Sequence, residues 1–244
     1  MAINLHKYAN PRRFLSIIGA IYPWSVALTV VLLGAGLYLA LFVAPPDYQQ
    51  GETVRIMFVH VPAAWMGLMV YTMMAISSAV GLIWKHPVAD LTAKAAAPIG
   101  ACFTFLALVT GALWGQPMWG TFWVWDARLT SMLILLFLYF GYMALWESFD
   151  DQTKAAKAAA ILALVGIVNV PIIKFSVDWW NTLHQPASVA TMAGPKIHSS
   201  ILIPLLVMAL AYTAFFVMLL IMRVRAEILT RRLRILQISE VREQ

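Results

Sequence analysis

Charged residues and cysteine are scarce in this chain. Of its 244 residues, 11% are Asp, Glu, Lys or Arg, 62% are hydrophobic, and the mean hydropathy is +0.80. A soluble domain is about one quarter charged, so the composition excludes an ordinary water-soluble protein. It also excludes a disordered chain, which needs low hydrophobicity. The single cysteine, Cys102, excludes an intrachain disulfide and a C-x-x-C site. Its apolar neighbours predict that it is buried in the core.

Several functional motifs are missing as well. Gly115, Gly120 and Thr121 have a spacing similar to that of a phosphate loop, but the lysine is absent. The chain therefore has no motif with which to drive ATP-powered transport alone. It contains no C-x-x-C-H segment, which excludes a covalently attached c-type haem. Ionisable residues are rare in the apolar runs, which argues against a pump or an ion channel.

Long apolar runs fill most of the chain. About 20 such residues cross the hydrocarbon layer as a helix, and continuous rather than alternating runs indicate helices. We therefore predict an all-α integral membrane bundle of six transmembrane helices in a single membrane domain, 1–244. The predicted spans are approximately 14–43, 57–84, 96–114, 130–147, 158–177 and 200–222. The first run is about twice as long as the core of a signal peptide, so we interpret it as a retained span.

The positive charges are distributed unequally between the two faces of this bundle. The N-terminus, the loops 85–95 and 148–157 and the C-terminal tail hold thirteen of the seventeen Lys and Arg residues, and the other face of the bundle holds four. Lys and Arg favour the cytoplasmic side, so both termini are predicted to be cytoplasmic. The loops 44–56, 115–129 and 178–199 then face outward. Topology explains the net charge of +6, and we predict no nucleic-acid partner.

The tail 223–244 is basic, and its apolar residues have near-helical spacing. Two interpretations remain open. The tail is either an anchor on the anionic inner leaflet of the lipid membrane or a docking helix for a cytoplasmic partner.

The loop 115–129 and the residues beside it are rich in tryptophan. Six of the ten tryptophans lie on the predicted outer side, namely Trp114, Trp119, Trp123, Trp125, Trp179 and Trp180. An aromatic belt would populate both membrane interfaces, and it would not need Gly115, Pro117 and Gly120 to bend the chain between the rings. We therefore favour an aromatic platform for a large planar apolar ligand over a belt alone.

Two histidines flank this platform. His60 opens the second span, with Pro62 expected in the first helical turn, and His184 follows the last pair of tryptophans. Two imidazoles can hold a haem iron from both sides, so we predict His60 and His184 as the metal ligands. Arg55 and Arg128 are candidates for pairing with the propionates.

The remaining polar candidates carry weaker hypotheses. His198 is a reserve ligand, disfavoured because it has no aromatic neighbours, and His6 and His86 are expected to be solvated. For Asp126 three roles stay open: a salt bridge to Arg128, an N-cap for the fourth span, or a hydrogen bond that orients a ligating histidine.

The segment W-G-Q-P-M-W-G-T-F-W-V-W-D-A-R-L-T closely resembles the tryptophan-rich "WWD" signature of haem-handling membrane proteins. Together with L-V-T-G-A-L-W-G, A-P-P-D-Y-Q-Q-G, H-V-P-A-A-W and S-V-D-W-W-N-T-L-H-Q, it identifies the chain as similar to the CcmC family of cytochrome c maturation. The similarity covers nearly the whole chain and is weakest in the tail. It implies that His60 and His184 are the axial ligands and that Trp114, Trp119, Trp123, Trp125 and Asp126 contact haem. Phe122 stands where the family often has tryptophan, so the indole N–H is missing there.

The resemblance also implies a function. Haem b would be bound transiently at the periplasmic face of the bacterial inner membrane and delivered to a periplasmic haem chaperone. The other implied partners are a small single-span companion subunit and the membrane and ATPase subunits of an ABC transporter. We expect a binding protein rather than an enzyme. The alternatives are a b-type electron-transfer membrane cytochrome and a permease subunit without a cofactor.

Overall fold

The computed structural model describes residues 10–185, 188–189 and 194–243. Six helical segments in this part of the chain are long and apolar enough to cross a membrane, and the described residues form no β-strand beyond one isolated bridge. The predicted all-α bundle of six spans is therefore confirmed. The α-helices are α1 (Pro11–Tyr38), α2 (Met57–Trp84), α3 (Pro87–Trp119), α4 (Ala127–Glu147), α5 (Gln152–Gly166), α6 (Asn169–Trp179) and α7 (Ser199–Glu243). A π-helical turn, η2 (Leu39–Val43), extends α1, and a 3-10 turn, η3 (Glu52–Ile56), precedes α2.

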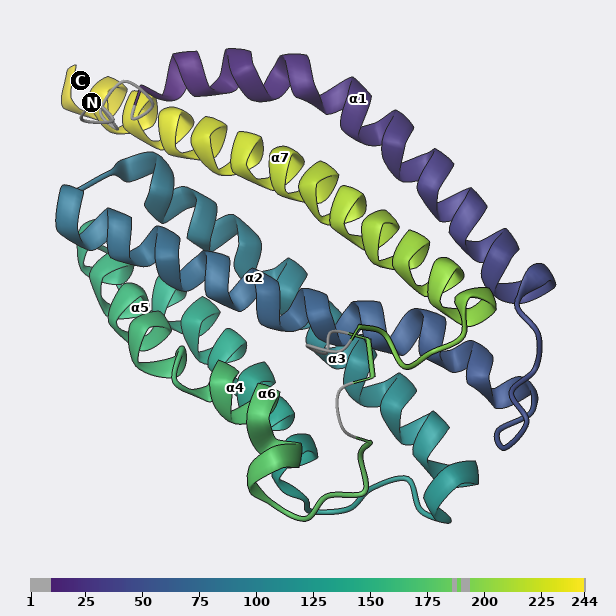
Figure 1. Ribbon diagram of the computed structural model, residues 1–244. Coiled ribbons are helices and arrows are strands. Elements are labelled where there is room, and N and C mark those ends of the chain that lie inside the picture. The colour runs from purple at the N-terminus through teal and green to yellow at the C-terminus, as the bar shows by residue number, and fades with distance from the viewer. Residues whose placement is uncertain (1–9, 186–187, 190–193, 244) are drawn as a thin grey trace.

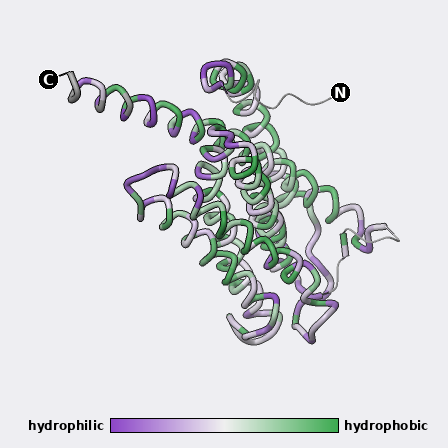
Figure 2. Tube along the Cα trace, turned by 90° about the vertical axis from the view of Figure 1, so that its left-hand side faces the viewer, coloured by the Kyte–Doolittle hydropathy of each residue, from purple (hydrophilic) through white to green (hydrophobic). Residues whose placement is uncertain are grey.

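The first and last helices lie together on one side of the bundle. Figure 1 shows α1 alongside α7, with α2 and α3 in the middle and α4, α5 and α6 on the other side. The beginning of α1 and the end of α7 lie at the same end of the molecule (Figure 1). In Figure 2, hydrophobic segments fill the bundle, and the end of α7, with hydrophilic and hydrophobic turns in alternation, projects beyond the other helices.

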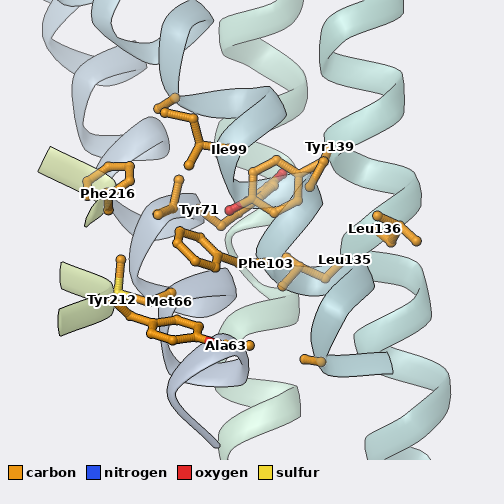
Figure 3. Packing of buried hydrophobic residues seen from close by; sticks show 14 of the residues in the cluster. Ala63, Met66, Tyr71, Ile99, Phe103, Leu135, Leu136, Tyr139, Tyr212 and Phe216 are labelled. Carbon is orange, nitrogen blue, oxygen red and sulfur yellow. The ribbon is translucent and has the colours of Figure 1, made fainter. Parts of the chain in front are cut away.

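Aromatic side chains from neighbouring helices join the middle of the bundle (Figure 3). The rings of Tyr71 on α2 and Tyr139 on α4 meet edge to face at 5.1 Å, and the Tyr139 hydroxyl donates to the Gly67 carbonyl at 2.8 Å. Phe103 on α3 lies 5.6 Å from Tyr212 on α7. These contacts join α2 to α4 and α3 to α7 in the middle of the bundle.

The third span is longer than its apolar run suggests. His86 accepts a hydrogen bond from the Ala89 amide at 3.1 Å and caps the helix, so α3 begins at Pro87 rather than near residue 96. His86 is thereby buried, and the expectation that it is solvated is wrong; His6 lies outside the described residues. At its other end α3 continues to Trp119 and is ended by Gly120, whose φ is 75°. The first part of the tryptophan-rich segment, residues 114–119, is therefore helical.

The fifth span is broken. α5 ends at Gly166 and α6 begins at Asn169, close to Pro171, which has no N–H with which to continue the helical hydrogen bonding. The Asn169 side-chain amide donates to the Ser131 carbonyl on α4 at 2.8 Å. This bond ties the broken segment to α4.

Two expectations about individual residues in the spans are wrong. Cys102 is exposed on α3, on the same helix face as the exposed Phe105 and Val109. Lipid solvates apolar side chains, so an apolar neighbourhood does not imply burial against protein. Pro62 lies inside α2 rather than in its first turn, because the helix begins at Met57.

Candidate functional site

Six of the predicted site residues converge where α2 begins, α3 ends, α4 begins and the chain leaves α6. We call this region the histidine end. It is the opposite end of the bundle from the beginning of α1 and the end of α7 (Figure 1). The converging residues are His60, Trp114, Trp119, Asp126, Arg128 and His184.

The His60 ring is held by acceptors on α3. Its Nδ1 lies 2.9 Å from the Ala107 carbonyl and 3.2 Å from the Thr110 hydroxyl. The Thr110 hydroxyl donates its own hydrogen to the Leu106 carbonyl at 2.6 Å, so it also presents a lone pair to the ring. Because both partners accept, Nδ1 carries the proton of the neutral ring and Nε2 keeps a free lone pair. The ring packs edge-on against Trp114 at 5.7 Å.

His184 is held in the same manner by a carboxylate. Its Nδ1 lies 3.3 Å from Asp126 Oδ2, and its ring packs against Trp119 at 4.9 Å. Burial lowers the pKa of His184, although the nearby Asp126 carboxylate opposes this shift. The imidazole is therefore neutral at pH 7, with Nδ1 protonated and Nε2 available as a ligand atom.

The two imidazoles lie in one electrostatic neighbourhood. His60 interacts with His184 and with Arg128, and His184 interacts with Arg128 and Asp126. The described residues contain no cluster of three or more His, Cys, Asp or Glu side chains that could hold a bare metal ion. Two histidines suit instead a metal whose other ligands come from a macrocycle, as in haem.

Asp126 has two of the three roles left open by the sequence. Its Oδ1 accepts from the Leu129 amide at 2.7 Å and caps α4, while its Oδ2 faces His184. No direct salt bridge to Arg128 occurs among the described residues. One carboxylate thus couples the start of a helix to the orientation of a histidine.

The two arginines have structural partners. Arg128 donates to the Ser176 hydroxyl at 3.2 Å and to the Lys174 carbonyl at 3.3 Å, which joins α4 to α6. Arg55 pairs with Glu52 and donates to the carbonyls of Ala40 and Leu41, which closes the π-helical end of α1. Their role towards propionates stays a prediction.

The tryptophans divide into anchored and open rings. The Trp114 indole donates to the Gln50 side chain at 3.0 Å, and Trp123 meets Trp125 edge to face at 5.4 Å. Trp125 is 75% exposed, and Phe122, Trp179 and Trp180 are at least half exposed. The Trp123 indole N–H is buried and has no acceptor among the described residues. A ligand with oxygen acceptors would satisfy it, and this, with two free imidazole nitrogens and open aromatic faces, fits a porphyrin carrying propionates.

Comparison with known proteins agrees with this arrangement. Residues 4–239 match the family model described as heme exporter protein C. The chain belongs to this family, CcmC. It is 61% identical over 238 residues to the heme exporter protein C of Bradyrhizobium diazoefficiens, covering 98% of this chain and 90% of the relative. The Paracoccus denitrificans heme exporter protein C is 45% identical over 98% of this chain and 100% of its own length.

A third relative extends the comparison to an organelle. A ccmC-like mitochondrial protein of Marchantia polymorpha, named for cytochrome c biosynthesis, is 54% identical over 76% of this chain and 77% of its own length. The predicted family resemblance is therefore confirmed, and the multi-pass membrane chain is a haem-handling component of cytochrome c maturation.

Within this CcmC chain, sequence reasoning missed the residues that hold the ring nitrogens and indoles. Gln50, Thr110 and the Ala107 carbonyl make these contacts. Thr110 belongs to the family-like segment L-V-T-G-A-L-W-G, but nothing in a single sequence pairs it with His60. The reserve ligand His198 is exposed and bonds to the nearby Ser200 hydroxyl at 2.9 Å.

Proposed function

We propose that this protein binds haem b transiently at the histidine end and delivers it to a soluble haem chaperone in the periplasm. His60 Nε2 and His184 Nε2 would hold the iron from its two sides. The observation that carries the proposal is the matched fixation of the two rings: each Nδ1 is occupied by an acceptor from another segment of the chain. Neither Nε2 has a hydrogen-bond partner among the described residues, and the two rings are close enough to interact electrostatically.

The location of the pair favours delivery over permanent retention. A b-type electron-transfer cytochrome, the second candidate, buries its haem between facing helices. Here His184 belongs to the irregular segment after α6, and Trp125, Trp179 and Trp180 remain open to an incoming partner. A ligand on a connecting segment can withdraw without unfolding a helix, so an acceptor's own ligand can replace it.

The chain itself would make and break no covalent bond, so we propose a binding protein rather than an enzyme. The aromatic rings would shield the haem faces from water, and the two imidazoles would hold the iron. Release would begin when a ligand of the acceptor replaces one histidine, and it would be complete when the other histidine has also left the iron. Arg128, which lies near both histidines, is the cation that would meet a propionate; Arg55 lies at the end of α1, where it donates to Glu52 and to the Ala40 and Leu41 carbonyls.

Orientation and partners complete the proposal. The excess of Lys and Arg at the end opposite the histidines supports a bacterial inner-membrane protein with cytoplasmic termini and a periplasmic site. Family membership supports a periplasmic haem chaperone, a small single-span companion, and the membrane and ATPase subunits of an ABC transporter as partners.

The direct test is absorption spectroscopy of purified protein and three histidine variants. We expect a Soret band with the visible bands of six-coordinate haem. His60→Ala and His184→Ala should each weaken binding or shift the spectrum, whereas His198→Ala should do neither. Rescue of His198→Ala by free imidazole, without rescue of the other two, would overturn the ligand assignment.

A second experiment separates delivery from electron transfer. Haem-loaded protein is mixed with the soluble haem chaperone, and the two are separated by size. Haem in the soluble fraction supports delivery. Haem that stays with the membrane protein and can be reduced and reoxidised there supports a b-type cytochrome, and colourless purified protein supports a permease subunit without a cofactor.

A further inference from the structure

We propose that Gly111 and Gly115, four residues apart on the same face of α3, are positioning residues for His60 and His184. Each glycine lacks a side chain and so leaves space for a ring to lie against α3, and we call this space a seat. Gly111 would admit the His60 ring to its acceptors, and Gly115 would admit the Trp119 ring that supports His184. Their role towards iron rests on the proposed function, but the seats themselves are a property of this chain without haem.

The first seat follows from the closeness of His60 to α3. A methyl group on Gly111 would lie 2.8 Å from His60 Cε1 and 3.3 Å from its Nδ1. Carbon atoms that are not bonded need about 3.5 Å or more, so any side chain at 111 pushes the ring away. The same approach brings Nδ1 to 2.9 Å from the Ala107 carbonyl, one turn earlier on α3. The bare Cα therefore permits the bond that determines which ring nitrogen is protonated.

The second seat acts on His184 through an aromatic ring. Trp119 folds back over its own helix, and a methyl group on Gly115 would lie 2.9 Å from its Cε3 and 3.1 Å from its Cζ3. The same indole packs against His184 at 4.9 Å. The second support of the His184 ring is Asp126, whose carboxylate contacts Nδ1. Displacing Trp119 would leave the imidazole with one support instead of two.

These glycines differ from those that serve helix packing. A methyl group on Gly67 would meet Thr104, and one on Gly100 would meet Tyr139, both in the bundle core. Gly34 on α1 would meet nothing within 4 Å. Glycine weakens a helix, so its occurrence twice within two turns of α3 needs a local reason. Gly111 leaves space for the His60 imidazole, and Gly115 leaves space for the Trp119 indole that packs against His184.

A test without haem reads the rings directly. Protein labelled with ¹⁵N-histidine is purified in detergent, and the imidazole nitrogens are observed by NMR. We expect His60 to have Nδ1 protonated and Nε2 bare in the native chain. Gly111→Ala should change the His60 signals and leave the His184 signals unchanged. Gly115→Ala should change the His184 signals and leave the His60 signals unchanged. The control Gly34→Ala should change neither set of signals. Unaltered His60 signals in Gly111→Ala would overturn the first seat, and unaltered His184 signals in Gly115→Ala the second.

A haem titration then measures the consequence at the iron. Loss of a supporting contact typically weakens metal binding by about 10- to 100-fold. We expect a loss of this size in Gly111→Ala, with a shift towards the spectrum of His60→Ala. A variant that combines Gly111→Ala with His60→Ala should bind haem no more weakly than His60→Ala alone, because both changes remove the same interaction between His60 and the iron. Fully additive losses would show that Gly111 acts elsewhere.

The two proposals fail separately. If His60→Ala leaves the haem spectrum unchanged, the ligand assignment is wrong, while the NMR result still decides whether Gly111 seats the ring. If Gly111→Ala does not accumulate, Thr110→Val serves instead, since it keeps the volume and removes only the hydroxyl that accepts from Nδ1. It should shift the His60 signals in the same direction and by less, and no shift would contradict the proposal.

Discussion

The two ends of the bundle use polar groups in different ways. At the end where α7 leaves the other helices, which we call the charged end, Lys94 pairs with Glu227 at 3.0 Å and lies over the Trp146 ring at 5.0 Å. Arg223 donates to the Ala95 carbonyl at 3.1 Å. The ion pair and this hydrogen bond join α7 to α3, whereas the Trp146 indole N–H is buried without an acceptor among the described residues. At the histidine end His60 and His184 are each bonded through Nδ1, and neither Nε2 has a hydrogen-bond partner among the described residues.

We infer from this difference that the charged end stabilises the fold and that the histidine end is available to bind haem. At the charged end the Lys94–Glu227 ion pair and the Arg223 hydrogen bond fasten α7 to α3 and stabilise the fold. Half-satisfied groups at the histidine end are held rigidly but keep one interaction available. A preorganised site binds more tightly because less ordering remains to be done. Equivalent substitutions at the two ends should therefore have separable effects on haem binding and on stability.

The largest effect is expected from the histidines themselves. Removing both ligands, His60→Ala with His184→Ala, should reduce haem affinity by more than about 100-fold, because each ligand should contribute at least as much as the outer contacts that orient it. His86→Asn is the control at the charged end, since asparagine is a good N-cap. Titration of detergent-purified protein with haem measures both. Equal haem affinities for the double histidine variant and His86→Asn would contradict the proposal that haem binds at the histidine end.

The next effect separates the two roles of Asp126. Asp126→Asn keeps a helix cap, since asparagine is as good as aspartate at this position, but it replaces the carboxylate that faces His184. Haem affinity should fall about 10- to 100-fold with little change in thermal stability. Asp126→Ala should lose the same affinity and also about 1 kcal/mol of stability. A normal affinity in Asp126→Asn would show that the carboxylate serves only the helix.

A third prediction applies to the charged end alone. Lys94→Met leaves Glu227 without its partner and should destabilise the protein by about 1–3 kcal/mol. Thermal unfolding in detergent measures this loss, and haem affinity at a temperature well below the transition should be unchanged. A fall in affinity there would mean that the two ends are energetically coupled.

The smallest effect compares exposed tryptophans. Trp125 at the histidine end and Trp84 at the end of α2 are both substantially exposed. Trp125→Ala should weaken haem binding by about 0.5–1.5 kcal/mol, the usual strength of an aromatic contact, and Trp84→Ala should not change it. Both variants should reach the membrane in normal amounts. Loss of the Trp125→Ala protein itself would instead favour an aromatic belt.

Much of this arrangement could be predicted from the residues in order. Apolar runs of sufficient length located the spans, and the order of the spans placed His60, His184 and most of the tryptophan-rich segment at one end of the bundle. Predictions failed where a local contact overrides composition. Cys102 faces outward from α3 although its neighbours are apolar, His86 is a buried helix cap, and the fifth span breaks after Gly166. The tail 223–244 continues α7 as one helix through Glu243, which the spacing of its apolar residues indicated.

The sequence alone determined that this chain lies in a membrane and which residue types gather at one end, because the lengths of apolar runs and the sign of the flanking charges act locally along the chain. Only the tertiary structure decided which nitrogen of each histidine is free. That depends on a carbonyl and a hydroxyl of α3 and on a carboxylate at the start of α4. Hydrogen bonds act over about 3 Å, so their pattern exists only after distant segments have packed together.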